Sequence, residues 1–276
     1  MIPIAPIYIV CFFTFIIHMT EALAYSMRLA GVRTRQIAIA MAFVTSTLLI
    51  SRLSNMAQAP LLGAMVDFSI LDGSQDALVQ LESHFRLIIF AEFCGAIMGG
   101  VLTPTMARLF QFAIRRFLSV GSLPRVVGHA LRPSSLVKIT KQIRVPRLSM
   151  RRSLSLSGIP KQFLILNIFV TSIYCIGVLC SLLAGAYNPQ FRSTAIQLSG
   201  IINGMATIMF TIFVDPSGAR VTDQAINGHR PEKDVRSVVF FLQLGKILGT
   251  LIVAQLLFKP LTYYIMAVTE WLATNL

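Results

Sequence analysis

The stretch APIYIVCFFTFIIHMTEALAYSMRL, residues 5–29, decides the fold class of this chain. It exceeds the ~20 residues that a helix needs to cross a hydrocarbon core ~30 Å thick. It lacks the basic start of a signal peptide, and no small-residue cleavage site follows it. We therefore expect residues 5–29 to remain in the protein as a transmembrane helix.

The rest of the sequence has the same character. Of its 276 residues, 55% are hydrophobic and 13% are charged, and the mean hydropathy is +0.73. A water-soluble domain of this length needs far more polar surface. We predict an all-α, polytopic integral membrane protein of about six transmembrane helices, forming one domain over residues 1–276. The predicted spans are Ala5–Leu29, Gln36–Val66, Arg86–Phe110, Gln162–Tyr187, Thr194–Val214 and Val235–Phe258. Beyond Pro260, the apolar tail is either a bent continuation of the last span or a short interfacial helix.

The connections between the spans predict how the chain is oriented. Arg28, Arg33 and Arg35 follow the first span, whereas residues 67–84 carry acidic side chains and no Lys or Arg. The segment 115–161 contains eleven Lys or Arg and no acidic residue. Basic segments thus alternate with acidic or short ones, as the positive-inside rule requires. We predict that segment 115–161 is cytoplasmic and that both termini lie outside the cytoplasm.

The basic segment 115–161 is expected to be a cytoplasmic or interfacial linker within the domain. Nucleic acid is a conceivable partner for so many cations, but the segment has no zinc spacing, recognition-helix pattern or interleaved aromatic residues. Anionic headgroups attract each basic residue near a membrane surface by ~1 kcal/mol. Membrane lipids, and not nucleic acid, are therefore the predicted partner of this segment.

Enzymatic chemistry is not predicted. No nucleophile elbow, phosphate-binding loop or metal-ligand spacing is present, so we expect no catalytic residue, metal or cofactor. The polar segment 215–224 is interpreted as a capped, solvated turn. The cysteines are interpreted as small buried hydrophobic residues; they are Cys11, Cys94, Cys175 and Cys180.

Ionisable side chains inside the spans are the main functional signal. In the first span, His18, Glu21, Tyr25 and Arg28 fall on one stripe, within an arc of roughly 80° at the helical period. In the second span, Arg52 lies ~24 Å from the inner end at 1.5 Å per residue.

Further polar positions lie in the other spans. Asn55 shares the side of Arg52, Asn203 lies in the fifth span, and Glu92 is expected to be shallower. Lys246 lies ~15 Å from the inner end of the sixth span. Close helix packing is predicted at three Gly-x-x-x-Gly motifs: Gly95/Gly99, Gly200/Gly204 and Gly245/Gly249.

Two interpretations of the intramembrane charges stay open. A charge at the bilayer centre costs at least ~2.5 kcal/mol, so these groups should face the interior and pair. A Glu21–Arg52 or Glu21–Lys246 pair could simply fix the register of the helices. Alternatively, one carboxylate facing two cations leaves an excess of positive charge that suits an anionic ligand.

Several stretches resemble one known family. They are His18–Arg33, Ser51–Pro60 with Gly63 and Val66-Asp67, Asn203–Thr207, Val214-Asp-Pro, Thr222-Asp-Gln and Gly245-Lys-x-x-Gly249. In this pattern the chain resembles the Amj-type lipid II flippases, an alternative to the MurJ flippases. The resemblance covers most of the chain and is weakest in the basic segment.

The resemblance implies a protein of the bacterial plasma membrane that moves lipid II, the undecaprenyl-pyrophosphate-linked cell-wall precursor, to the outer leaflet. The resemblance identifies no binding residues, so we predict them only from the charged and polar side chains inside the spans. Arg28, Arg52 and Lys246 are the expected phosphate contacts, since guanidinium groups suit bidentate phosphate binding. Asn55 and Asn203 would contribute further substrate contacts. His18 and Glu21 would compensate the cations and couple transport to protons or to the membrane potential.

Two other function classes stay open. The same charges would serve an ion-coupled transporter of a small anionic solute, for which a cavity closed to lipid is expected. A non-transporting scaffold of an envelope complex would use them only to register helices. The sequence leaves the coupling ion and the oligomeric state undetermined.

Overall fold

The chain forms a bundle of long helices, shown by a computed structural model that describes residues 4–130, 154 and 161–275. Six helical runs are long and apolar enough to cross a membrane, which confirms the predicted fold class and number of spans. The helices are α1 (Ile4–Ala24), α2 (Ser26–Thr34), α3 (Ile37–Asp72), α4 (Gln75–Val120), α5 (Leu123–Ala130), α7 (Lys161–Tyr187), α8 (Arg192–Met209), α9 (Asp215–Ile226), α10 (Glu232–Leu248) and α11 (Ala254–Asn275).

Short helical segments of other types connect some of these. A 3-10 turn, η2 (Pro189–Phe191), precedes α8. Two π-helical segments, η3 (Phe210–Val214) and η4 (Gly249–Val253), join α8 to α9 and α10 to α11. Two spans are therefore continuous helical runs, 189–226 and 232–275.

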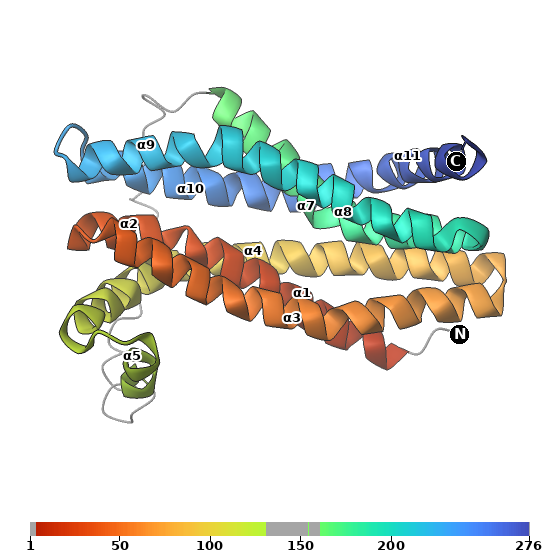
Figure 1. Cartoon of the computed structure of the whole chain (residues 1–276), viewed down its shortest axis with the longest axis horizontal. Helices are drawn as coiled ribbons and strands as arrows, with labels where there is room; N and C mark the ends of the chain where they lie inside the picture. Colours follow the sequence, from red (N-terminus) through yellow and green to blue (C-terminus); the bar gives the residue numbers. More distant parts are fainter. Residues whose placement is uncertain (1–3, 131–153, 155–160, 276) are drawn as a thin grey trace.

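The six spans form two halves of three spans each, which lie side by side in Figure 1. In the first half, the run of α1 and α2 packs against α3 and α4. In the second, α7 packs against α8 and against the run of α10 and α11. Each half has an odd number of spans, so the second half crosses the membrane in the opposite sense to the first.

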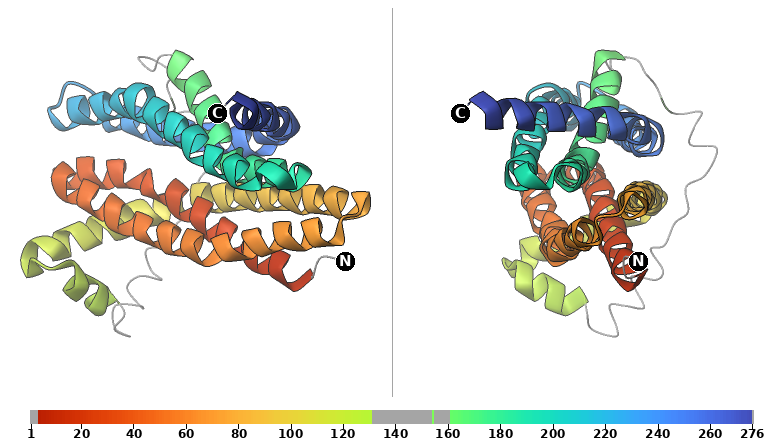
Figure 2. Two further views of the ribbon diagram at one scale, coloured as in Figure 1. Left: turned by 45° about the vertical axis from the view of Figure 1, so that its right-hand side comes forward. Right: turned by 90° about the vertical axis from the view of Figure 1, so that its right-hand side faces the viewer.

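Prolines inside the spans do not end the helices. Pro60 lies within α3, Pro104 within α4 and Pro260 within α11. Neighbouring helices and π-type adjustments can satisfy the backbone groups that proline leaves unpaired. The apolar tail thus continues the last span, and α11 runs at an angle to α10 (Figure 2).

The structure corrects two expectations, on segment 215–224 and on the length of the third span. A third expectation, on the basic segment 115–161, concerns residues that are only partly described. Segment 215–224 is helical, within α9, and is not a turn. The third predicted span is longer than expected, because α4 continues to Val120 and takes in the first residues of the basic segment. Of that segment, α5 is also described, while residues 131–153 and 155–160 lie outside the described parts.

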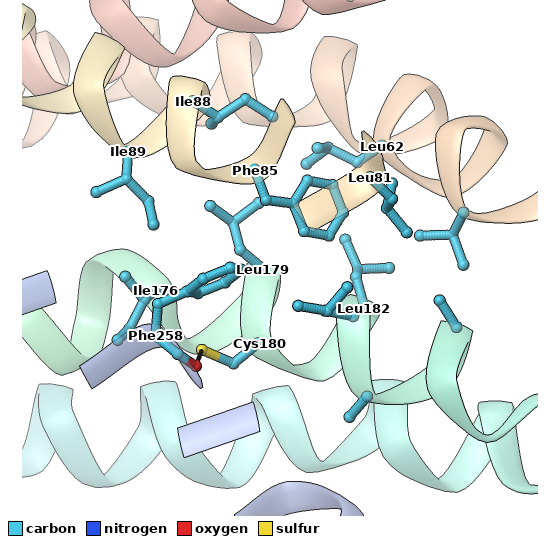
Figure 3. Packing of buried hydrophobic residues seen from close by; sticks show 14 of the residues in the cluster. Leu62, Leu81, Phe85, Ile88, Ile89, Ile176, Leu179, Cys180, Leu182 and Phe258 are labelled. Carbon is cyan, nitrogen blue, oxygen red and sulfur yellow. Dashed lines mark hydrogen bonds between the residues drawn. The ribbon is translucent and has the colours of Figure 1, made fainter. Parts of the chain in front are cut away.

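An apolar cluster joins the halves near the end of the bundle where α1 begins and α11 ends (Figures 1 and 3). Phe85 of α4 and Phe258 of α11 meet edge to face, with ring centroids 6.5 Å apart. Ile176 and Leu179 of α7 are buried in the same cluster (Figure 3). Since lipid is as apolar as these side chains, close packing is what holds them together.

Two of the three predicted glycine motifs lie at helix contacts. A Cβ on Gly95 would collide with the Phe15 carbonyl oxygen of α1, and a Cβ on Gly99 would lie 2.9 Å from the Met19 carbonyl oxygen. Gly249 is similarly close to the Ile168 carbonyl oxygen of α7. Around Gly200 and Gly204, by contrast, no atom of the described chain lies within 4 Å of such a Cβ.

Gly95→Ala is expected to destabilise the bundle by about 1–3 kcal/mol, because the added methyl group would push α4 off the backbone of α1. The matched control Gly204→Ala should be neutral or stabilising, since alanine favours helix and the site has room. Thermal unfolding of both variants in detergent tests this. Equal unfolding midpoints would contradict the proposed contact between α1 and α4.

Candidate functional site

The first of two neighbouring cavities lies between the halves and has a mainly apolar wall. It has a volume of about 320 Å³. Its charged lining residues are Arg28, Glu21, Lys246 and Asp215, which come from α2, α1, α10 and α9. We call it the apolar cavity.

The second cavity is more polar and has a volume of about 230 Å³. Its charged or titratable lining residues are His18, Glu21, Arg52, Glu92 and Cys175. Its amide-bearing lining residues are Asn55, Gln58 and Asn203. We call it the polar cavity.

The polar cavity has an ordered wall along α3. The Thr14 hydroxyl of α1 donates a 2.8 Å hydrogen bond to Gln58 Oε1, and Gln58 Nε2 donates to Asn55 Oδ1 at 3.4 Å. Thr14 and Gln58 are buried, whereas Asn55 is exposed. The buried pair thus fixes the position of an amide at the cavity surface.

An ion pair lies where the two cavities meet. Lys246 Nζ of α10 donates to Glu21 Oε2 of α1 at 2.5 Å, and Ser51 donates to Glu21 Oε1 at 3.3 Å. Lys246 is buried, and Glu21 lines both cavities, as does Tyr174 of α7. Of the two pairs considered for Glu21, the structure shows the one with Lys246.

A second ion pair joins the halves near the α2 end of the apolar cavity. Arg28 Nη2 donates to Asp215 Oδ1 at 2.7 Å. Gly218, one turn along α9, leaves room for the guanidinium, because a Cβ there would lie 3.2 Å from Arg28 Cζ. Farther out, Arg33 Nη2 donates to Glu232 at 2.7 Å.

Arg52 differs from the other two cations. Its side chain is exposed at the polar cavity, and the described part of the chain offers it no carboxylate within ion-pair distance. An exposed guanidinium with free N–H donors can take a bidentate anion without first giving up a partner.

A cluster of three buried groups closes the deep side of the polar cavity. His18 Nε2 lies 3.6 Å from Glu92 Oε1, and His18 Nδ1 lies 3.9 Å from Cys175 Sγ. All three side chains are buried. Glu92 is therefore not shallower than the stripe on the first span, as expected from sequence, but packed against His18.

Both cavities reach the outer surface of the bundle along one seam. Met41 and Arg52 of α3 line the cavities and are exposed, as is Thr207 of α8 on the facing side. The packing of α3 is with α1, α2, α4 and α7, while α8 packs on α7, η3 and α11. The α3–α8 seam is thus a side opening of the site.

All seven residues that the sequence singled out line these cavities, but their charges balance differently from the expectation. Glu92 and Asp215 add two carboxylates to Glu21, opposite Arg28, Arg52 and Lys246. The three cations and three carboxylates balance, and the only local excess of positive charge among these lining residues is at Arg52, because Arg28 and Lys246 are paired. The sequence could have identified Glu92 as a lining residue, because a carboxylate within a predicted span is itself a sign of a functional position. Nothing in the sequence pairs Asp215 with Arg28 or Cys175 with His18, because those contacts join distant segments.

Comparison with known proteins gives two agreeing matches. The sequence model of the family described as Alternate to MurJ matches residues 13–269. A protein of Bacillus subtilis (strain 168), the lipid II flippase Amj, is 35% identical over 266 residues, which are 96% of this chain and 97% of that protein. No solved structure matches.

Removal of one partner of the Glu21–Lys246 pair should destabilise the protein more than removal of both. Glu21→Gln or Lys246→Met leaves a buried charge without its partner, which costs about 3–5 kcal/mol, whereas the double variant leaves none. Chemical unfolding in detergent should therefore rank the double variant above either single one. Additive losses would show that the two groups are not coupled.

Proposed function

The chain belongs to the Amj (Alternate to MurJ) family, and from this premise we propose that it flips undecaprenyl-pyrophosphate-linked lipid II across the bacterial plasma membrane. It does so as a transporter, without an enzymatic step. The observation that carries the proposal is the α3–α8 seam, which opens a charged interior directly to lipid.

The shape of the site supports a lipid with an anionic head. Such a molecule can leave its polyprenyl tail in the hydrocarbon while its head crosses the protein. The α3–α8 seam supplies the lateral passage for the tail, and the two cavities supply the interior for the head. A small anionic solute needs no lateral passage, so the side opening favours the lipid substrate over that rival.

The three cations give the pyrophosphate successive contacts. Arg28 lies in the apolar cavity near the α2 end, Lys246 lies where the cavities meet, and Arg52 lies in the polar cavity. Asn55 and Asn203 face the polar cavity from α3 and α8. We propose that the head binds Arg28 first and reaches Arg52 after passing Lys246.

Glu21 serves as the internal anion of the empty site. Its carboxylate neutralises Lys246 at 2.5 Å, with His18 Nδ1 3.8 Å away. An arriving phosphate oxygen can replace the carboxylate on the ammonium. Because the replaced and replacing groups are both anionic, Lys246 stays compensated at every stage. Glu21 and His18 thus adjust charge, while the cations hold the substrate.

Movement of one half against the other provides alternating access. The ion pairs Arg28–Asp215 and Lys246–Glu21 both join the first half to the second. At the opposite end of the bundle, Arg192 pairs with Asp67 across the same interface. Opening at one end and closing at the other would exchange these pairs, as in transporters that rock one bundle against another around a central site.

The orientation follows from the basic connections. We propose that the ends of α2 and α4 face the cytoplasm and that both termini lie outside it. The apolar cavity, with Arg28, then lies toward the leaflet in which the precursor is made. The polar cavity, with Arg52, lies toward the leaflet to which it is delivered.

Arg52→Ala should reduce lipid II flipping at least about tenfold, because it removes the exposed guanidinium with which no carboxylate of residues 4–130 and 161–275 competes. The matched control is Arg108→Ala, which removes an exposed arginine of α4 that lines neither cavity. Accumulation of inner-leaflet lipid II in cells without a MurJ flippase measures the effect. Equal flipping by both variants would remove Arg52 from the proposed path.

A bulky residue in the α3–α8 seam should block transport. Thr207→Trp places an indole in the apolar cavity, whereas the control Ile208→Trp places it on the exposed, lipid-facing side of α8. Purified protein in vesicles with labelled lipid II should lose flipping only in the first variant. Retained flipping with Thr207→Trp would show that the head does not pass this seam.

A further inference from the structure

The His18–Glu92–Cys175 cluster has a composition that an anionic substrate does not explain. Its members come from α1, α4 and α7, with exposed fractions of 5%, 3% and 8%. One ligand atom from each lies within 4.8 Å of the others. A carboxylate here would repel an anion, and the imidazole and the thiol beside it are ligands for metal ions, so this part of the polar cavity suits a cation.

An unsatisfied acceptor marks the same position. Glu92 Oε2 is buried and has no hydrogen-bond partner within the described parts of the chain, although buried polar atoms are nearly always satisfied. The nearest ammonium, Lys246, is already bound to Glu21 at 2.5 Å. Glu92 Oε2 is therefore open to a further partner, and a metal ion in the polar cavity would supply one.

We propose that His18, Glu92 and Cys175 bind a divalent transition-metal ion, and that Zn²⁺ is the ion that fits them best. An imidazole nitrogen, a carboxylate oxygen and a thiolate sulfur are the donor types of protein zinc sites. The cysteine thiol gives up its proton on binding. The thiolate and the carboxylate then neutralise the dication.

The geometry is close to that of a metal site. Bonds of about 2.0–2.3 Å in a tetrahedron place neighbouring donor atoms about 3.3–3.7 Å apart. In the structure one donor atom from each residue lies within 4.8 Å of the others. Glu92 Oε1 lies 3.6 Å from His18 Nε2 and Cys175 Sγ lies 3.9 Å from His18 Nδ1, so the imidazole has to turn to present a single nitrogen to both. Small side-chain rotations bring one nitrogen, the oxygen and the sulfur around a single ion.

The site is of the open type and spans both halves. All three residues line the polar cavity, so a fourth coordination position would face the cavity, as in sites with three protein ligands. His18 and Glu92 belong to the first half and Cys175 to the second. A bound ion would hold the halves together at this level. Metal binding requires neither flipping nor lipid II, and so stands apart from the proposed function.

Cobalt(II) titration of the purified, chelator-stripped full chain in detergent tests the proposal. We expect one equivalent to give the visible bands of tetrahedral cobalt and a near-ultraviolet thiolate charge-transfer band, both displaced by Zn²⁺. Cys175→Ser should abolish the charge-transfer band. Glu92→Gln should weaken cobalt affinity at least about tenfold, since even loss of an outer-shell partner costs about 10–100-fold.

Cys180→Ser is the matched control, because Cys180 is also buried on α7 but does not line the polar cavity, and its Sγ donates to the Phe258 carbonyl oxygen. It should keep the full spectrum. The proposal is overturned if the unaltered protein gives no tetrahedral spectrum, whatever the variants do. It is also overturned if the charge-transfer band persists in Cys175→Ser or disappears in Cys180→Ser.

Discussion

The rest of the site depends on the Glu21–Lys246 ion pair. A lysine buried on α10 cannot stay charged in hydrocarbon without an anion beside it, and Glu21 of α1 supplies that anion at 2.5 Å. The pair draws the central span of the first half to the last span of the second. It also stands between the two cavities. Any anion that passes from one cavity to the other must therefore compete with Glu21 for the same ammonium.

The halves are held together by contacts of different kinds at different depths. Apolar side chains such as Phe85 and Phe258 join them at one end, whereas ion pairs such as Arg28–Asp215 and Arg33–Glu232 join them at the other. Apolar packing is lost only when the surfaces separate. Ion pairs can exchange partners with an anionic head as it passes. An interface of this kind can open without leaving charges bare in the membrane.

The side opening determines which kind of anion the charges of the site can bind. In a closed cavity, Arg52 and its neighbours would suit any anion of the right size. Along the α3–α8 seam they suit an anion attached to a lipid, because the apolar part of that molecule never has to leave the bilayer. The family to which the chain belongs agrees with this conclusion. The His18–Glu92–Cys175 cluster lies in the wall of the same polar cavity and adds the donor types of metal sites to it.

The sequence by itself determined the membrane fold, the six spans and the set of polar positions inside them. Hydrophobic length and helical period are local properties, and local properties can be read along a chain. It could not determine partners, since Lys246 might equally have left Glu21 to Arg52. It also placed Glu92 too shallow and took Asp215 for part of a turn, because depth and pairing depend on how helices tilt and which faces meet. Only the packing of α1 against α4 and of the two halves against each other decided that Glu92 meets His18, that Asp215 meets Arg28, and that Arg52 has no carboxylate partner among the described residues.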